Sequence, residues 1–357
     1  LRYHIGSMYE LEKLLQQHHK AIWDKYVIRV QTQKALHIHV SKIADFMEEL
    51  GRFPTRDELI SNGIITLNIF RYFFKNQTGL ENILKEMCPD IIASFLSIQD
   101  IVDSKFDSTD VEDYDQFMIS TVVSNCKVDK GAYNAITTWK NAVGGLSIYQ
   151  PIADPAKRGQ GQEMLFDPIL SDDLIQIGDI SINSKVHLKS VLLSAKQLRP
   201  HTGLKRICDR NGINFVGSPK QYLTPLANLG EEPGYIFSGG AITDADYTTD
   251  RYMSNRTAYI SESTHSLGAG IVKILGENKF LFTNVNFFPD GSFTHCGVNY
   301  RPDGSTAVVK SQYIVVSDLH GVEVDPAAEE SILKAIEVYK PAEIFLHDSF
   351  SGASVNP

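Results

Sequence analysis

The sequence predicts a multidomain α+β protein with a helical N-terminal domain, a β-rich middle domain and the start of an α/β sheet at the C-terminus. A chain of 357 residues is longer than a single domain with one hydrophobic core usually is. Helical periodicity dominates residues 8–95, turn signals punctuate residues 235–310, and a strand–helix–strand pattern occupies residues 312–350. These changes of pattern predict the three parts.

The composition excludes several classes of protein. Hydrophobic residues make up 43% of the chain and charged residues 22%, which excludes a disordered or fibrous chain. No apolar run approaches the roughly 20 residues of a membrane span. The four cysteines are scattered, which favours reduced thiols in a cytoplasmic protein. Residues 1–7 have the character of an expression scar before Met8.

The helical domain is expected over residues 8–150, and its best signals are local. One helix is expected from Tyr9 to Trp23 and another from Leu36 to Leu50, where Gly51 ends it. Thr55 with Glu58 has the spacing of a capping box, which predicts a short helix over Arg56–Ser61. A further helix is expected to begin at Thr66, and another is expected over Glu81–Met87.

Residues 37–76 resemble the helix-turn-helix modules of phage and nuclease-associated proteins. In such a module the helix from Thr66 to Lys75 would lie in the major groove and offer its polar side chains to bases and phosphates: Asn68, Arg71, Lys75 and Asn76. Residues 8–100 carry eleven basic and twelve acidic side chains, and this net charge of −1 counts against the interpretation. A purely structural helical bundle or an oligomerisation domain is the alternative.

The middle domain is expected over residues 162–310, after a boundary rich in Pro, Gly and Gln near Pro151–Gly161. Two Pro-Asp-Gly turns, at 289–291 and 302–304, predict a meander of hairpins. His265 and His295 are single histidines, which are more often packed or surface residues than ligands.

Residues 183–225 are strongly basic within a chain of net charge −9. One acid, Asp209, accompanies eight basic residues: Lys185, Lys189, Lys196, Arg199, Lys205, Arg206, Arg210 and Lys220. Such a segment can neutralise the phosphates of DNA without regard to sequence. The alternative is an amphipathic helix, whose solvated face would carry part of this charge. Its apolar face would consist of Leu188, Val191, Leu192 and Leu198.

The C-terminal unit occupies residues 311–357. Tyr313–Val316 and Glu343–Leu346 are apolar runs of the kind that buried parallel strands use, and Asp325 with Pro326 predicts the start of the helix between them. Asp318 and His320 follow the first strand, and His347 and Asp348 follow the second. Because parallel strands present their carboxyl ends at one edge, Asp318, His320 and Asp348 are expected to converge.

These residue types indicate a site for two divalent cations. Residues two apart in an extended segment point the same way, so Asp318 and His320 can bind one ion while Asp348 bridges to a second. Two such ions can clamp a phosphate and generate a hydroxide. Mixed imidazole and carboxylate ligands suit Mn²⁺ or Zn²⁺, with Mg²⁺ a poorer match. The alternative is that these residues are turn formers and helix caps.

The arrangement resembles the calcineurin-like metallophosphoesterases, in particular the branch of double-strand-break-repair nucleases. The block from Val315 to Ser354 and the N-terminal extension are also similar to the pre-early DNases with which T-five-type coliphages degrade host DNA. The resemblance implies that Asp318 and His320 bind the first metal and that Asp348 bridges. His347 replaces the glycine of the family, which leaves it as a ligand, a phosphate contact or a packed ring.

The resemblance covers only the last 45 or so residues. The later Asn-His pair and two further histidine motifs of the family do not occur before Pro357. The C-terminal unit is therefore expected to be the truncated first part of a metallophosphoesterase domain, inactive by itself.

Two functions are expected from these features. The first is a phage-encoded, metal-dependent DNase that hydrolyses phosphodiesters of host DNA in the bacterial cytoplasm with Mn²⁺ or Mg²⁺ and acts as a homo-oligomer. The second is a non-catalytic module that binds DNA or a host protein through the helical domain and the basic segment.

Overall fold

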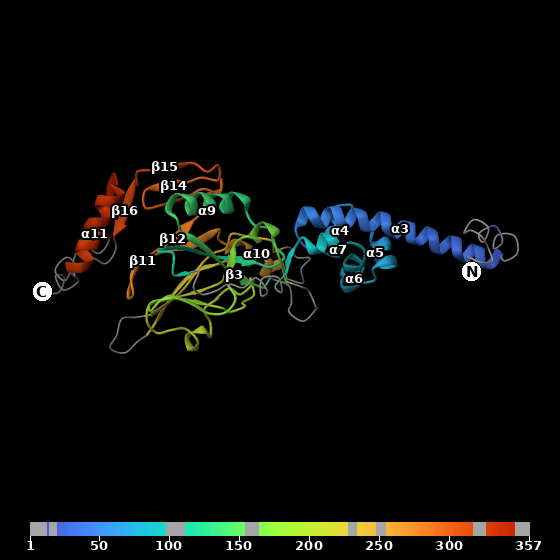
Figure 1. Cartoon of the computed structure of the whole chain (residues 1–357), viewed down its shortest axis with the longest axis horizontal. Helices are drawn as coiled ribbons and strands as arrows, with labels where there is room; N and C mark the ends of the chain where they lie inside the picture. Colours follow the sequence, from blue (N-terminus) through green and yellow to red (C-terminus); the bar gives the residue numbers. More distant parts are fainter. Residues whose placement is uncertain are drawn as a thin grey trace.

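The computed structural model shows a mixed α+β protein. It describes Lys13 and residues 20–97, 111–153, 164–227, 234–247, 255–316 and 326–346. A helical unit containing α3 (Lys20–Leu50) and a C-terminal unit containing α11 (Pro326–Tyr339) lie at opposite ends of the molecule, with the β-sheets between them (Figure 1). Within the described residues, no helix is long and apolar enough to cross a membrane. The predicted helix at Tyr9–Trp23 lies mostly outside the described residues.

The helical unit packs its short helices against the C-terminal half of α3. The short helices are α4 (Arg56–Ser61), α5 (Leu67–Phe73), α6 (Gln77–Met87) and α7 (Pro89–Ala93). Ile43 and Met47 of α3 are fully buried in one cluster with Phe70 and Leu84. The helix predicted at Leu36–Leu50 is confirmed, but it belongs to a helix that begins at Lys20.

The helix caps predicted for this unit are confirmed. The Thr55 side chain accepts a hydrogen bond from the backbone N–H of Glu58, and the Glu58 carboxylate accepts one from the Thr55 N–H at 2.7 Å. Thr66 caps α5 through the N–H of Ile69. Gly51 follows α3 with φ +69°, a conformation that glycine adopts without steric cost. The last predicted helix begins earlier than expected, at Gln77, because Asn76 caps it.

The first β-sheet has the strand order β12-β11-β2-β3-β5. Its strands are β2 (Gln116–Val123), β3 (Leu146–Ile152), β5 (Leu174–Ile175), β11 (Gly268–Gly276) and β12 (Lys279–Asn286). β2, β3 and β5 are parallel, whereas β11 pairs antiparallel with both β2 and β12. Helix α9 (Lys130–Val143) connects β2 to β3, so the sheet contains a β-α-β unit.

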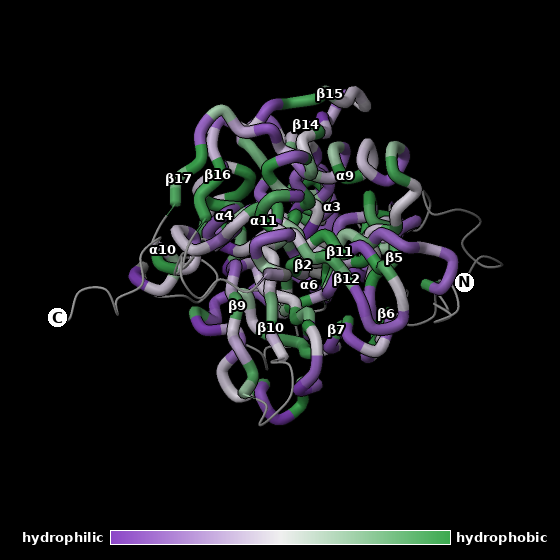
Figure 2. Tube along the Cα trace, turned by 90° about the vertical axis from the view of Figure 1, so that its left-hand side faces the viewer, coloured by the Kyte–Doolittle hydropathy of each residue, from purple (hydrophilic) through white to green (hydrophobic). Residues whose placement is uncertain are grey.

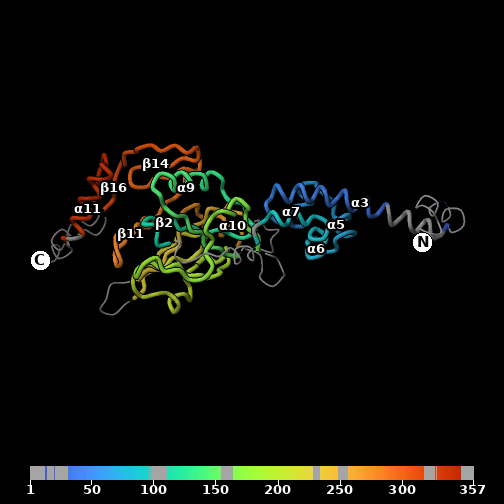
Figure 3. Tube along the Cα trace, in the orientation of Figure 1, coloured from blue at the N-terminus to red at the C-terminus, as the bar shows by residue number. Residues whose placement is uncertain are grey.

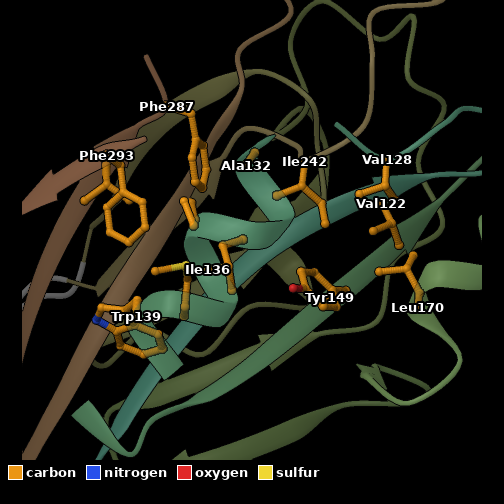
Figure 4. Close-up of a cluster of buried hydrophobic side chains, with 14 of the residues drawn as sticks. Val122, Val128, Ala132, Ile136, Trp139, Tyr149, Leu170, Ile242, Phe287 and Phe293 are labelled. Carbon is orange, nitrogen blue, oxygen red and sulfur yellow. The ribbon is translucent and has the colours of Figure 1, made fainter. Parts of the chain in front are cut away.

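Helix α9 covers one face of the first sheet. Asp129 caps its start, and Gly144 ends it in the left-handed conformation. Its Ile136 and Trp139 are fully buried against Tyr149 of β3 and Phe293 (Figure 4).

The second β-sheet packs on the other face of the first. Its strand order is β6-β7-β8-β10-β9, with β7, β8 and β10 parallel. The strands are β6 (Ile180–Asn183), β7 (Val186–Lys189), β8 (Ile213–Val216), β9 (Gln221–Leu226) and β10 (Gly234–Gly239). Phe215 and Phe237 from this sheet share a buried cluster with Phe117 and Ile119 of the first. The sheets are thus layered face to face, as the tube view also shows (Figure 3).

A three-stranded antiparallel sheet forms the third layer together with α9. It contains β13 (Phe293–His295), β14 (Val298–Tyr300) and β15 (Thr306–Val308). The predicted turn at 302–304 joins β14 to β15 as a hairpin, with the Gly304 N–H donating to the Arg301 carbonyl. The turn at 289–291 is present, but the hairpin predicted there is wrong, because it carries the chain from β12 into a different sheet.

The remaining elements are short. They are β1 (Leu96–Ser97), paired with β4 (Leu165–Phe166), α10 (Asn255–Ser263), and the 3₁₀ helices η2 (Pro168–Leu170) and η3 (Leu204–Arg206). The β1–β4 pair connects the helical unit to the sheets.

Two predictions of secondary structure are corrected. Residues 8–150 are not helical throughout, because the apolar runs 116–123 and 146–152 form buried parallel strands. An amphipathic helix does not form in 183–225, where the described residues form β7, β8, β9 and loops with one three-residue 3₁₀ helix. Val186 and Leu188 alternate with His187 and Lys189, and this spacing of two suits a strand.

Candidate functional site

The C-terminal unit has the strand–helix–strand structure that the sequence predicts. β16 (Tyr313–Val316) and β17 (Glu343–Leu346) are parallel, and α11 connects them. Tyr313 pairs with Glu343 at the start, and Val316 pairs with Leu346 at the end. The carboxyl ends of both strands are therefore level at one edge of the sheet.

The predicted metal ligands follow these level strand ends. Asp318 and His320 lie two and four residues after Val316, and His347 and Asp348 lie one and two residues after Leu346. All four residues lie outside the described part of the chain, as does the predicted cap Asp325. A site shared by residues that follow β16 and β17 requires both strands to end at the same edge of the sheet, because parallel strands offer ligands at their carboxyl ends. The pairing of β16 with β17 meets this requirement.

The unit exposes much of its apolar surface. Val315 is 65% exposed, Phe345 51% and Leu333 of α11 55%. In Figure 2 the hydrophobic colour of β17 lies at the edge of the molecule. β16 and β17 pair only with each other among the described strands.

Groups of three or more His, Cys, Asp or Glu side chains arranged to hold a metal ion do not occur among the described residues.

His265 and His295, the two single histidines weighed as possible ligands, contact other protein groups. His265 Nε2 lies 2.8 Å from the carbonyl oxygen of Thr243, so it carries the proton and donates. Its Nδ1 then accepts from the Tyr247 hydroxyl at 3.0 Å. Burial lowers the pKa of His265 to about 4, which keeps this neutral tautomer at neutral pH. His295 lies beside Cys296, with Nε2 3.4 Å from its Sγ.

Seven of the eight basic residues of 183–225 are at least partly exposed. Arg199, Lys205, Arg206 and Arg210 are exposed, and Lys185, Lys189 and Lys196 are half-buried. Lys189 Nζ forms ion pairs with Asp209 at 2.9 Å and with Asp179 at 3.1 Å. Its charge is therefore largely compensated within the protein.

Lys220 is a correction to the predicted DNA-binding set, because its side chain is buried. It is 2% exposed, and its Nζ donates to the Ala195 carbonyl oxygen at 2.6 Å. The ammonium also lies 5.7 Å from the centroid of the Tyr247 ring. Burial lowers the pKa of Lys220 to about 8. The prediction is wrong because the residue type alone does not show whether a side chain is buried.

The residues predicted to contact DNA from a helix-turn-helix module are on the surface. Asn68, Arg71 and Lys75 are exposed, and Tyr72, for which no role was predicted, is 66% exposed beside them. Asn76, predicted with them, instead caps α6 through the N–H of Gly79. Phe70, three residues from Phe73, faces the core. The spacing of three and four residues places Asn68, Arg71, Tyr72 and Lys75 on one face of α5 and its end.

A buried ionic network was not predicted. Arg52, 3% exposed, contacts both carboxylate oxygens of Glu58, and its Nη2 lies 2.7 Å from Oδ2 of Asp246. Burial opposes the charge of Glu58, but the hydrogen bonds and charge of Arg52 outweigh it and lower the pKa of Glu58 to about 2. The capping box signalled Glu58, whereas nothing in the sequence linked it to Asp246.

Comparison of the chain with protein-family models, with curated proteins and with solved structures found no significant match.

Proposed function

We propose that this chain belongs to a metal-dependent deoxyribonuclease of calcineurin-like metallophosphoesterase type, in which two divalent cations hydrolyse phosphodiester bonds. The observation that carries the proposal is the level ending of β16 and β17, directly before Asp318-Leu319-His320 and His347-Asp348. The resemblance to phage nucleases that degrade host DNA makes DNA the substrate of choice.

Three residues of this chain would hold the cations. Asp318 and His320 would bind the first ion, and Asp348 would bridge to the second. Mn²⁺ or Mg²⁺, or alternatively Zn²⁺, would supply Lewis-acid stabilisation and a metal-bound hydroxide. The aspartates are harder ligands than the imidazole, and this mixed set favours Mn²⁺ over Mg²⁺.

The test is degradation of linear DNA by the protein with added Mn²⁺. Asp318→Ala and Asp348→Ala should each reduce the rate by at least about a hundredfold, because each removes a ligand. Glu337→Gln is the control, since it removes an exposed charge from α11 in the same unit. Normal cleavage by Asp318→Ala, with folding verified by circular dichroism, would show that the proposal is wrong.

A second function is favoured by the exposed face of α5. Asn68, Arg71, Tyr72 and Lys75 present hydrogen-bonding, basic and aromatic groups to solvent. They support a non-catalytic module that binds DNA or a host protein. Binding of DNA in EDTA without cleavage on adding Mn²⁺, lost in Arg71→Gln, would favour this second function.

A further inference from the structure

The two faces of the second sheet have different surroundings. Phe215 and Phe237 point toward the first sheet, whereas Val216 and Ile236 alternate with them and point outward. The outward face is covered by residues 190–212, which we call the cover segment. Its apolar contacts with this face come from Val191, Leu193, Leu204 and Cys208.

The cover segment carries an excess of positive charge on its outer side. Its basic residues are Lys196, Arg199, Lys205, Arg206 and Arg210, and its one acid is Asp209. The Asp209 carboxylate is engaged by Lys189 from β7 at 2.9 Å. Within the described ranges, no salt bridge joins any of the five basic side chains to a carboxylate, and all but Lys196 are exposed. Four outward cations therefore face solvent.

An exposed aromatic ring lies beside the turn that bears two of these cations. Tyr222 of β9 is 42% exposed, and its ring packs edge-on against His201, with 5.8 Å between centroids. His201 belongs to the turn that bears Arg199 and Lys205, because the Leu204 N–H donates to the His201 carbonyl and the Thr202 N–H donates to that of Arg199. The Tyr222 ring and the turn that bears Arg199 and Lys205 thus occupy one region of the surface.

An unsatisfied polar atom lies beneath the same region. His201 is 5% exposed, and its Nδ1 is 2.8 Å from the Thr224 hydroxyl. Its Nε2 has no hydrogen-bond partner among the described residues. Burial lowers the pKa of His201 to about 4, so the ring is neutral and adds no charge to the four cations.

We propose that the cover segment and Tyr222 form a binding surface for single-stranded nucleic acid. The phosphates would contact Arg199, Lys205, Arg206 and Arg210, and a base would stack on Tyr222. Phosphate neutralisation and base–aromatic stacking together are the usual basis of sequence-independent binding to single strands. The choice of nucleic acid as the ligand rests on the proposed function. The inference adds that the bound nucleic acid is single-stranded and names the residues that bind it.

A membrane surface is the less favoured partner. Peripheral binding to anionic lipid generally uses an amphipathic helix with a continuous apolar face. The cover segment contains only the three-residue η3. Leu198 and Ile207 are exposed, but they are not arranged on a helix that could insert.

The test is binding of a fluorescein-labelled oligothymidine of about 20 nucleotides, followed by anisotropy in EDTA. The combined variant Arg199→Gln, Lys205→Gln, Arg206→Gln should lose at least about tenfold in affinity at low salt. Its log–log salt slope should flatten by about 2, because each lost phosphate contact removes about 0.7. The matched control is Lys273→Gln, Lys279→Gln, Lys310→Gln, which removes the same charge from exposed positions elsewhere.

Tyr222→Ala separates a single strand from a duplex. It should weaken oligothymidine binding by about fivefold or more and leave the affinity for a duplex unchanged, because stacked base pairs do not offer a free base. Equal losses in the two triple variants, no effect of Tyr222→Ala, or binding to phosphatidylserine vesicles instead of DNA would each overturn the inference.

The proposed function and this inference fail separately. Binding in EDTA does not need the metal ligands, so Asp318→Ala should bind oligothymidine as the wild type does. Loss of cleavage in Asp318→Ala with no binding defect supports the nuclease and leaves the surface intact. Normal cleavage and undiminished oligothymidine binding by the triple variant of Arg199, Lys205 and Arg206 would refute the proposed binding surface and leave the proposed nuclease function standing.

Discussion

Arg52 and Asp246 are 194 residues apart in the sequence, and their side chains meet where the helical unit joins the sheets. The Arg52 Nε and Nη2 atoms lie 3.1 Å and 2.7 Å from the same oxygen of Asp246. The same guanidinium contacts Glu58, whose carboxylate also caps α4. One buried cation therefore connects the start of a helix to the loop after β10.

Asp246→Asn should destabilise the protein by about 1.5–3 kcal/mol, because it removes a charge-assisted contact to a buried guanidinium. Urea unfolding followed by circular dichroism measures the loss. Asp57→Asn is the matched control: Asp57 pairs with Arg56, but the side chains are 42% and 52% exposed, so its effect should stay below about 1 kcal/mol. Equal effects of the two substitutions would contradict the importance of the buried contact.

The contribution of Glu58 to stability should depend on pH in the acid range. Its pKa falls from 4.5 to about 2 on folding, so the unfolded chain binds the proton more readily. The stabilisation is present above about pH 5 and is lost as pH falls toward 2, with a maximum of about 3 kcal/mol. Wild type and Glu58→Gln should therefore differ at pH 7 and converge near pH 2. A constant difference in unfolding midpoint across this range would contradict the prediction.

Lys220 should destabilise the folded protein at neutral pH. Its pKa falls from 10.5 to about 8 on folding, so the folded state carries an unfavourable charge below about pH 8, and the penalty disappears as pH rises through 10.5. We expect Lys220→Met to raise the melting temperature at pH 7 and to lose this advantage above about pH 10. A lower melting temperature for Lys220→Met would mean that the contacts with Ala195 and Tyr247 outweigh the cost of burial.

Gly270 of β11 should tolerate no side chain. A Cβ atom there would lie 2.7 Å from the Phe215 ring and 2.9 Å from the Phe237 ring, between the two packed sheets. Gly270→Ala should therefore cost about 1–3 kcal/mol in the free energy of unfolding. Gly276→Ala, on the same strand with no atom within 4 Å of the added Cβ, should change it by less than about 0.5 kcal/mol.

Short-range signals predicted much of the local structure. The caps at Thr55 and Thr66, the end of α3 at Gly51 and the helix at Arg56–Ser61 are all present. Each depends on contacts between residues three or four apart, which a sequence displays directly. The strands at Tyr313–Val316 and Glu343–Leu346 were predicted from apolar runs, and their parallel pairing is present. The burial expected for them is wrong among the described residues, because β17 is exposed along its whole length and β16 is buried only at Val316.

Long-range pairing was less predictable. The turn at 289–291 has the expected chemistry, yet β12 pairs with β11 and β13 pairs with β14. A turn specifies a local change of direction, and the choice of partner strand depends on which faces are buried. The candidate metal ligands Asp318, His320 and Asp348 stay a prediction, supported by the register of the strands that precede them.

The sequence by itself determined the caps of the N-terminal helices and the strand–helix–strand pattern of the C-terminal unit, because these depend on neighbours along the chain. The tertiary structure alone decided that Lys220 is buried while Lys205 and Arg206 are exposed, and that Arg52 meets Asp246. The physical reason is that burial and ion pairing arise from packing between segments far apart in the chain, and the composition of a segment does not specify which of its faces is covered.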